Sequence, residues 1–279
     1  MRMVKADLLR TAVRALFIEA NRSLPDDVRA CLRAAHKAEA GGLAKNILGR
    51  VIANYELAEA RGIPVCQDTG MACVFIALGE QVHIEGSISA AVDEGVRQGC
   101  AEGYLRASIV SDPLRRVNTG DNTPALLSVE IVPGDAVSVT VAPKGAGSEN
   151  MSAIRMLAPG DGSEGVERFV LETVEKAGAN PCPPIVVGVG IGGSFDKAAL
   201  IAKKALLRPL DRRHPVPYYA ELERRLLERI NATGIGPQGL GGTATALAVA
   251  VETLPCHIAC LPCAVNLNCH VARHKTTTL

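Results

Sequence analysis

Hydrophobic residues recur at helical spacing through the first sixty positions of the chain. Near the N-terminus this spacing predicts an amphipathic helix, whose apolar face comprises Leu8, Leu9, Val13, Leu16 and Phe17. A second helix is expected to open at residues 25–27, where a proline precedes two aspartates, because carboxylates are favourable at the positive end of a helix dipole. A third is expected from about residue 43 to residue 61, ending at Gly62. Residues 1–62 are therefore predicted to be mainly helical.

Beyond residue 62, short apolar runs typical of strands alternate with amphipathic stretches typical of helices. Strands are expected at residues 72–78, 125–132, 136–142 and 185–189, and two more between 243 and 267. Helices are expected at residues 87–96, 165–177, 196–207 and 221–230, the first of them capped by Ser87. Residues 143–162 are polar and turn-forming.

The segment Pro133-Gly134-Asp135 favours a tight turn, so the strands on either side of it are expected to pair as a hairpin. The chain shows no internal repeat, low-complexity tract or obvious linker. The order of elements predicts a mixed α/β (α+β) fold in which N-terminal helices precede a mixed β-sheet with flanking helices. We expect a single domain over residues 1–279.

Composition excludes several classes of function. The chain has 279 residues, of which 48% are hydrophobic, so it can bury a sizeable core. A net charge of +1, no basic run, few aromatic residues and no tryptophan argue against a nucleic-acid partner. No apolar run is long enough for a membrane span, and the N-terminal residues lack the apolar core of a signal peptide. We therefore expect a cytoplasmic protein.

A glycine-rich stretch, IVVGVGIGG, matches G-x-G-x-x-G at Gly188, Gly190 and Gly193. This spacing occurs in dinucleotide-binding proteins, and Asp211 lies near the distance expected of the ribose-binding acid. That acid should end a second strand, whereas the residues before Asp211 have the pattern of one basic helix. We reject nicotinamide binding and interpret the glycines as a tight strand-to-helix turn, or as a helix N-terminus that helps to hold an anion.

Nine cysteines are present, an odd number that in a reducing compartment suggests core fillers, metal ligands or nucleophiles. Cys256, Cys260 and Cys263 have the C-x3-C-x2-C spacing of radical-SAM clusters. In such enzymes most of a barrel follows the motif, whereas only sixteen residues follow Cys263 here. Their surroundings are apolar and strand-like, so we interpret these three as core thiols.

Cys66, Cys182 and Cys269 lie in different settings. Cys66 is followed by an amide, a carboxylate and a turn glycine, Cys182 is flanked by prolines that fix the backbone, and Cys269 lies where a predicted strand ends. Three thiolates are one fewer than a fully ligated cubane cluster needs, and an open iron can act as a Lewis acid. From the residues alone, a zinc ion with a water as fourth ligand is a further alternative.

Six blocks of the sequence closely resemble blocks of the class I fumarate hydratases, in the order found in the catalytic N-terminal half of that family. The resemblance covers about residues 5–275. The blocks are PVCQDTGMACVF, YLRASIVSDPLRRVNTGDNTPA, KGAGSENMSAIRMLAPGDG, NPCPPIVVGVGIGGSFDKAALIAKKALLRP, GIGPQGLGGTATALAV and PCHIACLPCAVNLNCHVARHK.

This resemblance implies an iron–sulfur hydro-lyase whose [4Fe–4S] cluster is held by three cysteines, at the positions of Cys66, Cys182 and Cys269, with one iron open to substrate. The single-chain enzymes of the family have a further C-terminal domain. The resemblance therefore implies an α subunit that works with a separate β subunit, expected as α2β2, with the active site between the two.

The resemblance also implies roles for five further residues. Arg106 corresponds to a substrate-binding arginine, suited to bidentate binding of a carboxylate. Gln67 and Asp68 contact substrate, and Asp68 orients or accepts a proton; the alternative for Asp68 is a turn-stabilising aspartate. His257 corresponds to a substrate-contacting histidine and acts in catalysis, whereas its apolar surroundings alone suggest a satisfied core residue. Gly147 offers backbone contact.

The expected reaction is the reversible hydration of fumarate, a small dicarboxylate, to (S)-malate. The nearest alternative is the α subunit of an L-tartrate dehydratase, and the blocks GDNTPA and GSENMS favour the fumarate branch by resemblance. A non-catalytic iron-sensing protein is a third possibility. The presence of all three cysteines together with Gln67, Asp68, Arg106 and His257 argues against it.

Overall fold

The computed structural model describes residues 1–279, which divide into two compact units. Unit 1 comprises Met1–Pro25, Asn54–Ala146 and Arg273–Leu279, and unit 2 comprises Asp26–Ala53 and Gly147–Ala272. Each unit has its own sheet and its own apolar core. The mixture of helices and strands confirms the predicted α/β fold, while the assignment of one catalytic domain stays a prediction. None of the helices is both long and apolar enough to span a membrane.

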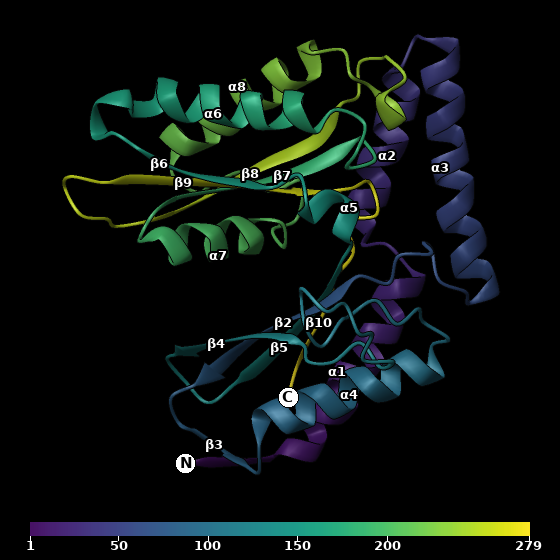
Figure 1. Ribbon diagram of the computed structural model, residues 1–279, viewed down its shortest axis with the longest axis vertical. Helices are drawn as coiled ribbons and strands as arrows, with labels where there is room; N and C mark the ends of the chain where they lie inside the picture. Colours follow the sequence, from purple (N-terminus) through teal and green to yellow (C-terminus); the bar gives the residue numbers. More distant parts are fainter. The chain divides into compact units, whose positions relative to one another are not determined.

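Unit 1 is built on a four-stranded sheet of order β10-β5-β2-β4. Helices α1 (Ala6–Arg22) and α4 (Ile88–Glu102) pack on one face of it (Figure 1). The Ser87 hydroxyl caps α4 by accepting a hydrogen bond from the Ala90 N–H at 3.3 Å, as predicted. The apolar face of α1 is buried as expected except for Leu8, which is 52% exposed. The strands are β2 (Met71–Gly79), β4 (Leu126–Val132), β5 (Val137–Lys144) and β10 (Lys275–Thr278).

The hairpin prediction is wrong, although both of its strands exist. β2 lies between them, parallel to β4 and antiparallel to β5. Five successive residues of β2, from Ala72 to Ile76, are buried, so this strand is covered on both faces. A strand of that kind needs a partner along each edge. β2 therefore lies between β4 and β5, the two strands that the turn residues alone had suggested would pair.

Unit 2 has a second four-stranded sheet, of order β6-β9-β7-β8. Helices α6 (Gly162–Ala177) and α8 (Pro217–Ala232) cover one face, and α7 (Phe195–Ala205) covers the other (Figure 1). The helices α2 (Asp26–Ala38) and α3 (Gly42–Arg61) confirm the expected N-terminal helices. The strands are β6 (Ala153–Leu157), β7 (Ile185–Gly192), β8 (Ala246–Leu254) and β9 (Leu261–Asn268).

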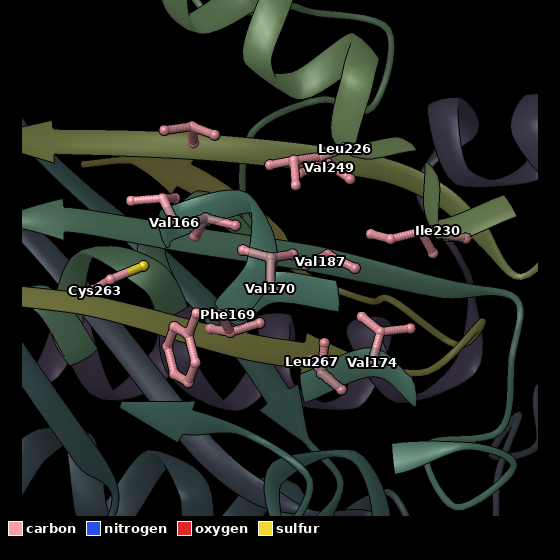
Figure 2. Packing of buried hydrophobic residues seen from close by; sticks show 14 of the residues in the cluster. Val166, Phe169, Val170, Val174, Val187, Leu226, Ile230, Val249, Cys263 and Leu267 are labelled. Carbon is pink, nitrogen blue, oxygen red and sulfur yellow. The ribbon is translucent and has the colours of Figure 1, made fainter. Parts of the chain in front are cut away.

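Alternating side chains of the unit 2 strands fill the core beneath α6 and α8. Figure 2 shows Val187, Val249 and Leu267 from three strands packed among Val170 of α6 and Leu226 of α8. All five are nearly or completely inaccessible to solvent. The sheet of unit 2 is therefore held between helical layers, which is why its strands have long apolar runs.

The glycines of the rejected dinucleotide motif allow α7 to pack closely on the sheet. A Cβ atom at Gly188 would lie 2.1 Å from the carbonyl oxygen of Ala202, and one at Gly190 would lie 2.2 Å from that of Ala198. The turn that follows contains Gly193 with φ +68°. Glycine is thus required by helix–strand packing and by the turn, in agreement with the steric interpretation.

Several short elements were not predicted from the sequence. The strands β1 (Arg2–Lys5) and β3 (Val82–Glu85) form a separate parallel pair. The edge strand β6 and the short helix α5 (Ala146–Glu149) lie in the segment interpreted as polar turns. Short strands and edge strands lack the apolar alternation that identifies a buried strand. Two 3-10 turns complete the structure, Pro159–Asp161 and Pro237–Gly239.

Replacing Gly190 by alanine is expected to destabilise the protein. The added methyl group would overlap the backbone of α7, and overpacking of this kind costs about 1–3 kcal/mol. Gly160→Ala is the matched control in unit 2, because no atom lies within 4 Å of its added Cβ, and its effect should stay below about 1 kcal/mol. Urea denaturation of both variants measures the difference; equal unfolding free energies would contradict the packing account.

Candidate active site

A loop of unit 1 presents Cys66 from an anchored backbone. The preceding residue, Val65, is buried, its N–H donates to the carbonyl of Asn21 at 2.8 Å, and its own carbonyl accepts from Asn54 Nδ2 at 2.9 Å. Cys66 is half-buried, and its Sγ atom accepts a hydrogen bond from the Asp68 N–H at 3.4 Å. The thiol is therefore placed by contacts with residues far from it in the sequence.

The Asp68 carboxylate closes the same loop. Its Oδ1 atom accepts from the Gly70 N–H at 3.1 Å, and its Oδ2 atom accepts from the Ala146 N–H at 2.9 Å. This is the turn-stabilising role that the sequence left as the alternative for Asp68. Each carboxylate oxygen has a further lone pair, so the proton-transfer role stays a prediction.

Arg106 is fixed against this loop by its backbone. Its N–H donates to the buried Thr69 hydroxyl at 2.9 Å, and its carbonyl accepts from Asn122 Nδ2 at 2.8 Å. Asn122 is completely buried, whereas the side chains of Arg106 and Gln67 are exposed. Unit 1 thus brings Cys66, Gln67 and Arg106 together, with the polar ends of the last two directed to solvent.

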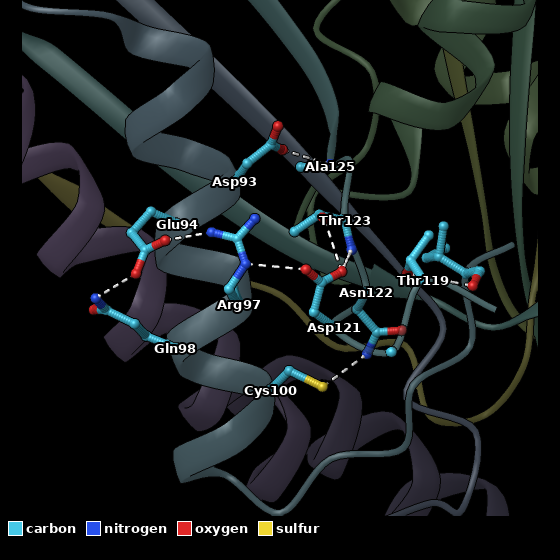
Figure 3. Close-up of polar contacts among 12 residues, drawn as sticks. Asp93, Glu94, Arg97, Gln98, Cys100, Thr119, Asp121, Asn122, Thr123 and Ala125 are labelled. Atoms are coloured by element: carbon cyan, nitrogen blue, oxygen red, sulfur yellow. Dashed lines mark hydrogen bonds and ion pairs between the residues drawn. The ribbon is translucent and has the colours of Figure 1, made fainter. Parts of the chain in front are cut away.

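Asp121 holds the segment that carries Asn122, as Figure 3 shows. Its Oδ1 atom accepts from the Thr123 N–H at 3.0 Å and from the Thr123 hydroxyl at 2.7 Å, and its Oδ2 atom accepts from Arg97 Nε at 3.0 Å. Burial tends to raise the pKa of Asp121, but the hydrogen bonds from Thr123 and Arg97 lower this pKa to about 2. The carboxylate is therefore charged at neutral pH and anchors the Arg106 segment to α4.

Unit 2 brings the loops of Cys182 and Cys269 together. The N–H of His270 donates to the Cys182 carbonyl at 3.4 Å, and His270 Nδ1 lies 2.9 Å from the same oxygen. Since a carbonyl only accepts, that bond requires a proton on Nδ1. Burial lowers the pKa of His270. Gln238 secures the neighbouring residue by donating to the Pro183 carbonyl from its backbone N–H at 2.8 Å and from its Nε2 atom at 2.9 Å.

Cys182 itself is exposed and has φ +55°, a left-handed conformation that is uncommon for a residue other than glycine. Cys269 is half-buried, and its N–H donates to Asn268 Oδ1 at 3.1 Å. Gly147 lies beside the Cys182 loop, because a Cβ atom built on it would be 3.5 Å from the Asn180 carbonyl. Three of the predicted site residues therefore lie together at one end of the unit 2 sheet.

A charged network supports that end of the sheet. Glu149 Oε1 accepts from Lys203 Nζ at 2.5 Å, and Glu149 Oε2 accepts from Asn266 Nδ2 at 3.1 Å. Glu149 follows Gly147 by two positions, and Asn266 precedes Cys269 by three. The network therefore ties the Gly147 segment to the strand that leads to Cys269.

The structure does not bring His257 together with Cys182 and Cys269. The sequence placed His257 in an apolar strand, but β9 begins only at Leu261, and His257 is exposed in the loop between β8 and β9. That loop lies at the opposite end of the same sheet (Figure 1). Of the predicted catalytic pair, only Asp68 is placed beside a predicted cluster ligand within its own unit.

The core-thiol interpretation is correct for one of its three cysteines. Cys263 is completely buried in β9, and burial raises its pKa to about 12, so it is an inert thiol. Cys256 is exposed and Cys260 is half-buried, because both precede the strand. For these two cysteines the prediction is wrong.

The donor set fits an iron–sulfur cluster with three protein ligands. Cys66, Cys182 and Cys269 lie on loops held by hydrogen bonds, none of the three is fully buried, and the loops of Cys182 and Cys269 are joined within unit 2 through His270. No three His, Cys, Asp or Glu side chains are grouped for a single metal ion. The same holds for the proposed cluster ligands, because Cys66 belongs to unit 1 whereas Cys182 and Cys269 belong to unit 2. The choice between a cluster and a zinc ion therefore stays a prediction.

Three residues that support the site were missed from the sequence. Arg273 is 4% exposed, and its Nη2 atom donates to the carbonyls of Asp68 at 2.5 Å and Thr69 at 3.1 Å. In the same way, Asn122 donates to the carbonyl of Arg106, and His270 donates to the carbonyl of Cys182. All three occur inside the resembling blocks, but their contacts span tens to hundreds of positions, and no local pattern reveals such contacts.

Comparison with known proteins assigns the chain to a family. The model of the family described as fumarate hydratase (Fumerase) matches residues 10–278. The chain belongs to this family. It is 45% identical over 266 residues to the "Putative L(+)-tartrate dehydratase subunit alpha" of Methanocaldococcus jannaschii, covering 92% of this chain and 93% of that protein. It is 36% identical over 257 residues to the L(+)-tartrate dehydratase subunit alpha of Escherichia coli strain UTI89, covering 91% and 84%.

These matches confirm the resemblance found in the sequence and identify the chain as a hydro-lyase of the fumarate hydratase and tartrate dehydratase α family. They cover nearly the full length of both units.

Replacing Asp121 by asparagine tests the anchor of the Arg106 segment. The folded-state pKa of Asp121 is about 2, below the ordinary value of 3.8, so its stabilising effect is present above about pH 4 and is lost as the pH falls towards 2. Asp121→Asn should therefore destabilise the protein by roughly 1 kcal/mol at pH 7, after allowing for solvent screening. Urea denaturation at pH 7 and pH 3 measures this; a deficit that did not shrink at pH 3 would contradict the assignment.

Proposed function

We propose that this protein is the α subunit of a [4Fe–4S]-dependent hydro-lyase that reversibly hydrates fumarate to (S)-malate together with a separate β subunit. The observation that carries the proposal is the hydrogen-bonded loop of unit 1, in which Cys66 and Asp68 share one short segment and Arg106 is fastened to it through Thr69. This arrangement holds a metal-binding thiol and a carboxylate-binding cation close together.

Arg106 is suited to bind one carboxylate of the substrate. Its guanidinium is exposed while its backbone is fixed on both sides, so little conformational freedom is lost when two parallel N–H groups bind a carboxylate. Gln67 is exposed in the adjoining loop and offers both an N–H donor and a carbonyl acceptor. A dianionic substrate thus meets one cation and one amide from unit 1.

The three cysteines would hold the cluster as thiolates. A bound cluster with one iron that has no protein ligand supplies Lewis-acid chemistry for the oxygen that is added or removed. The protein's own contribution is to present the thiols rigidly: Val65 anchors the Cys66 loop, and His270 fixes the Cys182 carbonyl. Gly147 lies beside the Cys182 loop with an exposed backbone that can contact substrate.

Asp68 is the proposed proton-transfer group of this chain. Both of its carboxylate oxygens accept backbone N–H groups, which orient the carboxylate and leave one lone pair on each oxygen for a proton. This oriented carboxylate would act on substrate bound by Arg106.

The proposed partner is a β subunit that completes the active site, in an α2β2 assembly. The two relatives are named as α subunits, and the match covers 93% and 84% of their lengths. A separate subunit would supply further groups for the second carboxylate of the substrate.

L(+)-tartrate is the second candidate substrate. It is favoured by the names of the two relatives, whereas fumarate is favoured by the resemblance of GDNTPA and GSENMS. Tartrate has two hydroxyl groups and fumarate has none, so the site would have to accommodate different polar groups. The residues of this chain described above serve either dicarboxylate.

The substrate assignment is tested by anaerobic reconstitution of iron and sulfide into the purified chain, followed by addition of its β subunit. We expect fumarate to be consumed, with malate as product, at a kcat/KM at least ten times that for L(+)-tartrate dehydration. A higher kcat/KM for tartrate would move the assignment to the second candidate. Turnover of neither compound by a complex with full iron content would reject both.

Replacement of Cys182 by serine is expected to abolish cluster assembly and activity, because it removes one of three thiolate ligands. The matched control is Cys31→Ser, since Cys31 is half-buried in α2 and belongs to no proposed site. The iron content of the two anaerobically reconstituted variants, with circular dichroism as a check of folding, gives the result. Normal iron content in Cys182→Ser would remove Cys182 from the ligand set.

A further inference from the structure

Strand β4 forms one edge of the unit 1 sheet, with β2 as its neighbour on the inner side (Figure 1). Three of its seven residues are apolar and exposed to solvent: Leu126 is 43% exposed, Val129 is 45% exposed and Ile131 is 64% exposed. A strand at the edge of a sheet has backbone N–H and C=O groups that another strand can bind. The edge of β4 therefore offers both hydrogen-bonding groups and apolar surface to another chain.

The other edges of the two four-stranded sheets are better protected. β10, the opposite edge of the unit 1 sheet, has the short polar sequence KTTT. In unit 2, the edge strand β6 carries Arg155 at its centre, and the edge strand β8 is mostly buried. Short, charged or covered edge strands are the usual means by which proteins prevent edge-to-edge association. Among these four edges, β4 is the one that exposes three large apolar side chains.

Two of the exposed side chains of β4 continue the apolar core of unit 1. In the parallel pair, Val129 lies beside Ile76 of β2, and Ile131 lies beside Leu78. Ile76 is buried in the cluster beneath α1 and α4, and Leu78 packs against that cluster. Residues that lie beside each other in a sheet point to the same face. Val129 and Ile131 therefore belong to the face that the helices cover, and the core reaches the solvent at this edge.

The sequence of β4, LLSVEIV, matches its own reverse about Val129. Two copies of the strand can run antiparallel with their Val129 residues opposite each other. The facing pairs are then Val129 with Val129, Leu127 with Ile131, Ser128 with Glu130, and Leu126 with Val132. Every apolar residue faces an apolar one and the glutamate faces a serine, a pattern that stabilises neighbouring strands.

Other registers of the same pairing fit less well. A pairing centred on Glu130 would place two carboxylates opposite each other, which is destabilising. A pairing centred on Ser128 would place Glu130 opposite Leu126, and Ile131 would face a residue outside the strand. Only the register centred on Val129 pairs all seven residues of β4 with residues of β4.

We propose that the edge of β4 binds the same edge of a second copy of this chain, which joins two four-stranded sheets into one sheet of eight strands. The twofold axis passes between the two Val129 residues and is perpendicular to the sheet, so α1 and α4 of both copies lie on one face. A second copy is the occupant because β4 matches its own reverse. The inference goes beyond the proposed function, since it depends on neither the cluster nor the substrate, and it gives the proposed α2β2 assembly a contact between its α subunits.

The test is the mass of the purified full-length chain in solution, measured by analytical ultracentrifugation over a range of concentrations. The wild-type chain should sediment as a dimer. Val129→Lys should raise the Kd of the dimer by roughly tenfold or more, because two ammonium groups would face each other across the twofold axis. Val129→Glu should weaken the dimer in the same way. An equimolar mixture of the two variants should form dimers at concentrations at which each variant alone is monomeric, because each lysine then faces a glutamate.

The matched control is Leu114→Lys, at a residue of unit 1 that is 90% exposed and lies outside β4; it should leave the Kd unchanged. Circular dichroism checks that the variants fold, and rescue by mixing shows it independently.

Three results would overturn the proposal: a wild-type chain that is monomeric at every concentration, a dimer whose Kd Val129→Lys does not change, or a mixture that dissociates as readily as the separate variants. If Val129→Lys leaves the dimer intact but abolishes binding of the β subunit, the edge serves that partner and the proposal is likewise overturned. None of these measurements requires a cluster or a substrate, so their failure leaves the proposed function to its own experiment.

Discussion

The structure of the candidate site depends on hydrogen bonds that distant segments direct at the backbone of one short loop. Asn54 holds the residue before Cys66, and the buried Arg273 guanidinium donates to the carbonyls of Asp68 and Thr69. A loop whose carbonyls are bound in this way cannot relax when its thiol is charged. Arg106 depends on the same loop through the Thr69 hydroxyl. Loss of one buried donor would therefore disturb both the Cys66 thiol and Arg106, the proposed substrate-binding cation.

In unit 2, a sheet fixes the positions of two of the proposed ligands. Strands fix their ends more firmly than loops do, and Cys182 and Cys269 lie just outside two adjacent strand ends. Close packing of α7 on Gly188 and Gly190 keeps those strands in place. The same sheet keeps His257 apart from Cys269, because the whole length of β9 lies between them.

The sequence predicted most of the long elements, because amphipathic helices and buried strands have clear periodicities. It also identified Cys66, Cys182, Cys269 and Arg106 as candidates, since motif resemblance is independent of geometry. It failed on strand pairing, where the Pro133 turn suggested a hairpin that β2 interrupts. The sequence also missed the supporting residues Asn122, His270 and Arg273, and it placed His257 in a strand rather than in a loop. Those features depend on which segments meet in space, and a local pattern contains no information about that.

The central claim is that three thiolates of this chain hold a cluster whose remaining iron is open to a dicarboxylate. The most direct measurement is the Mössbauer spectrum of the anaerobic complex, reconstituted with iron-57, before and after addition of substrate. The account predicts that one of the four iron sites changes its isomer shift when the dicarboxylate binds, while the other three do not. Four iron sites that are unaffected by substrate, or a complex that takes up zinc and no iron, would contradict it.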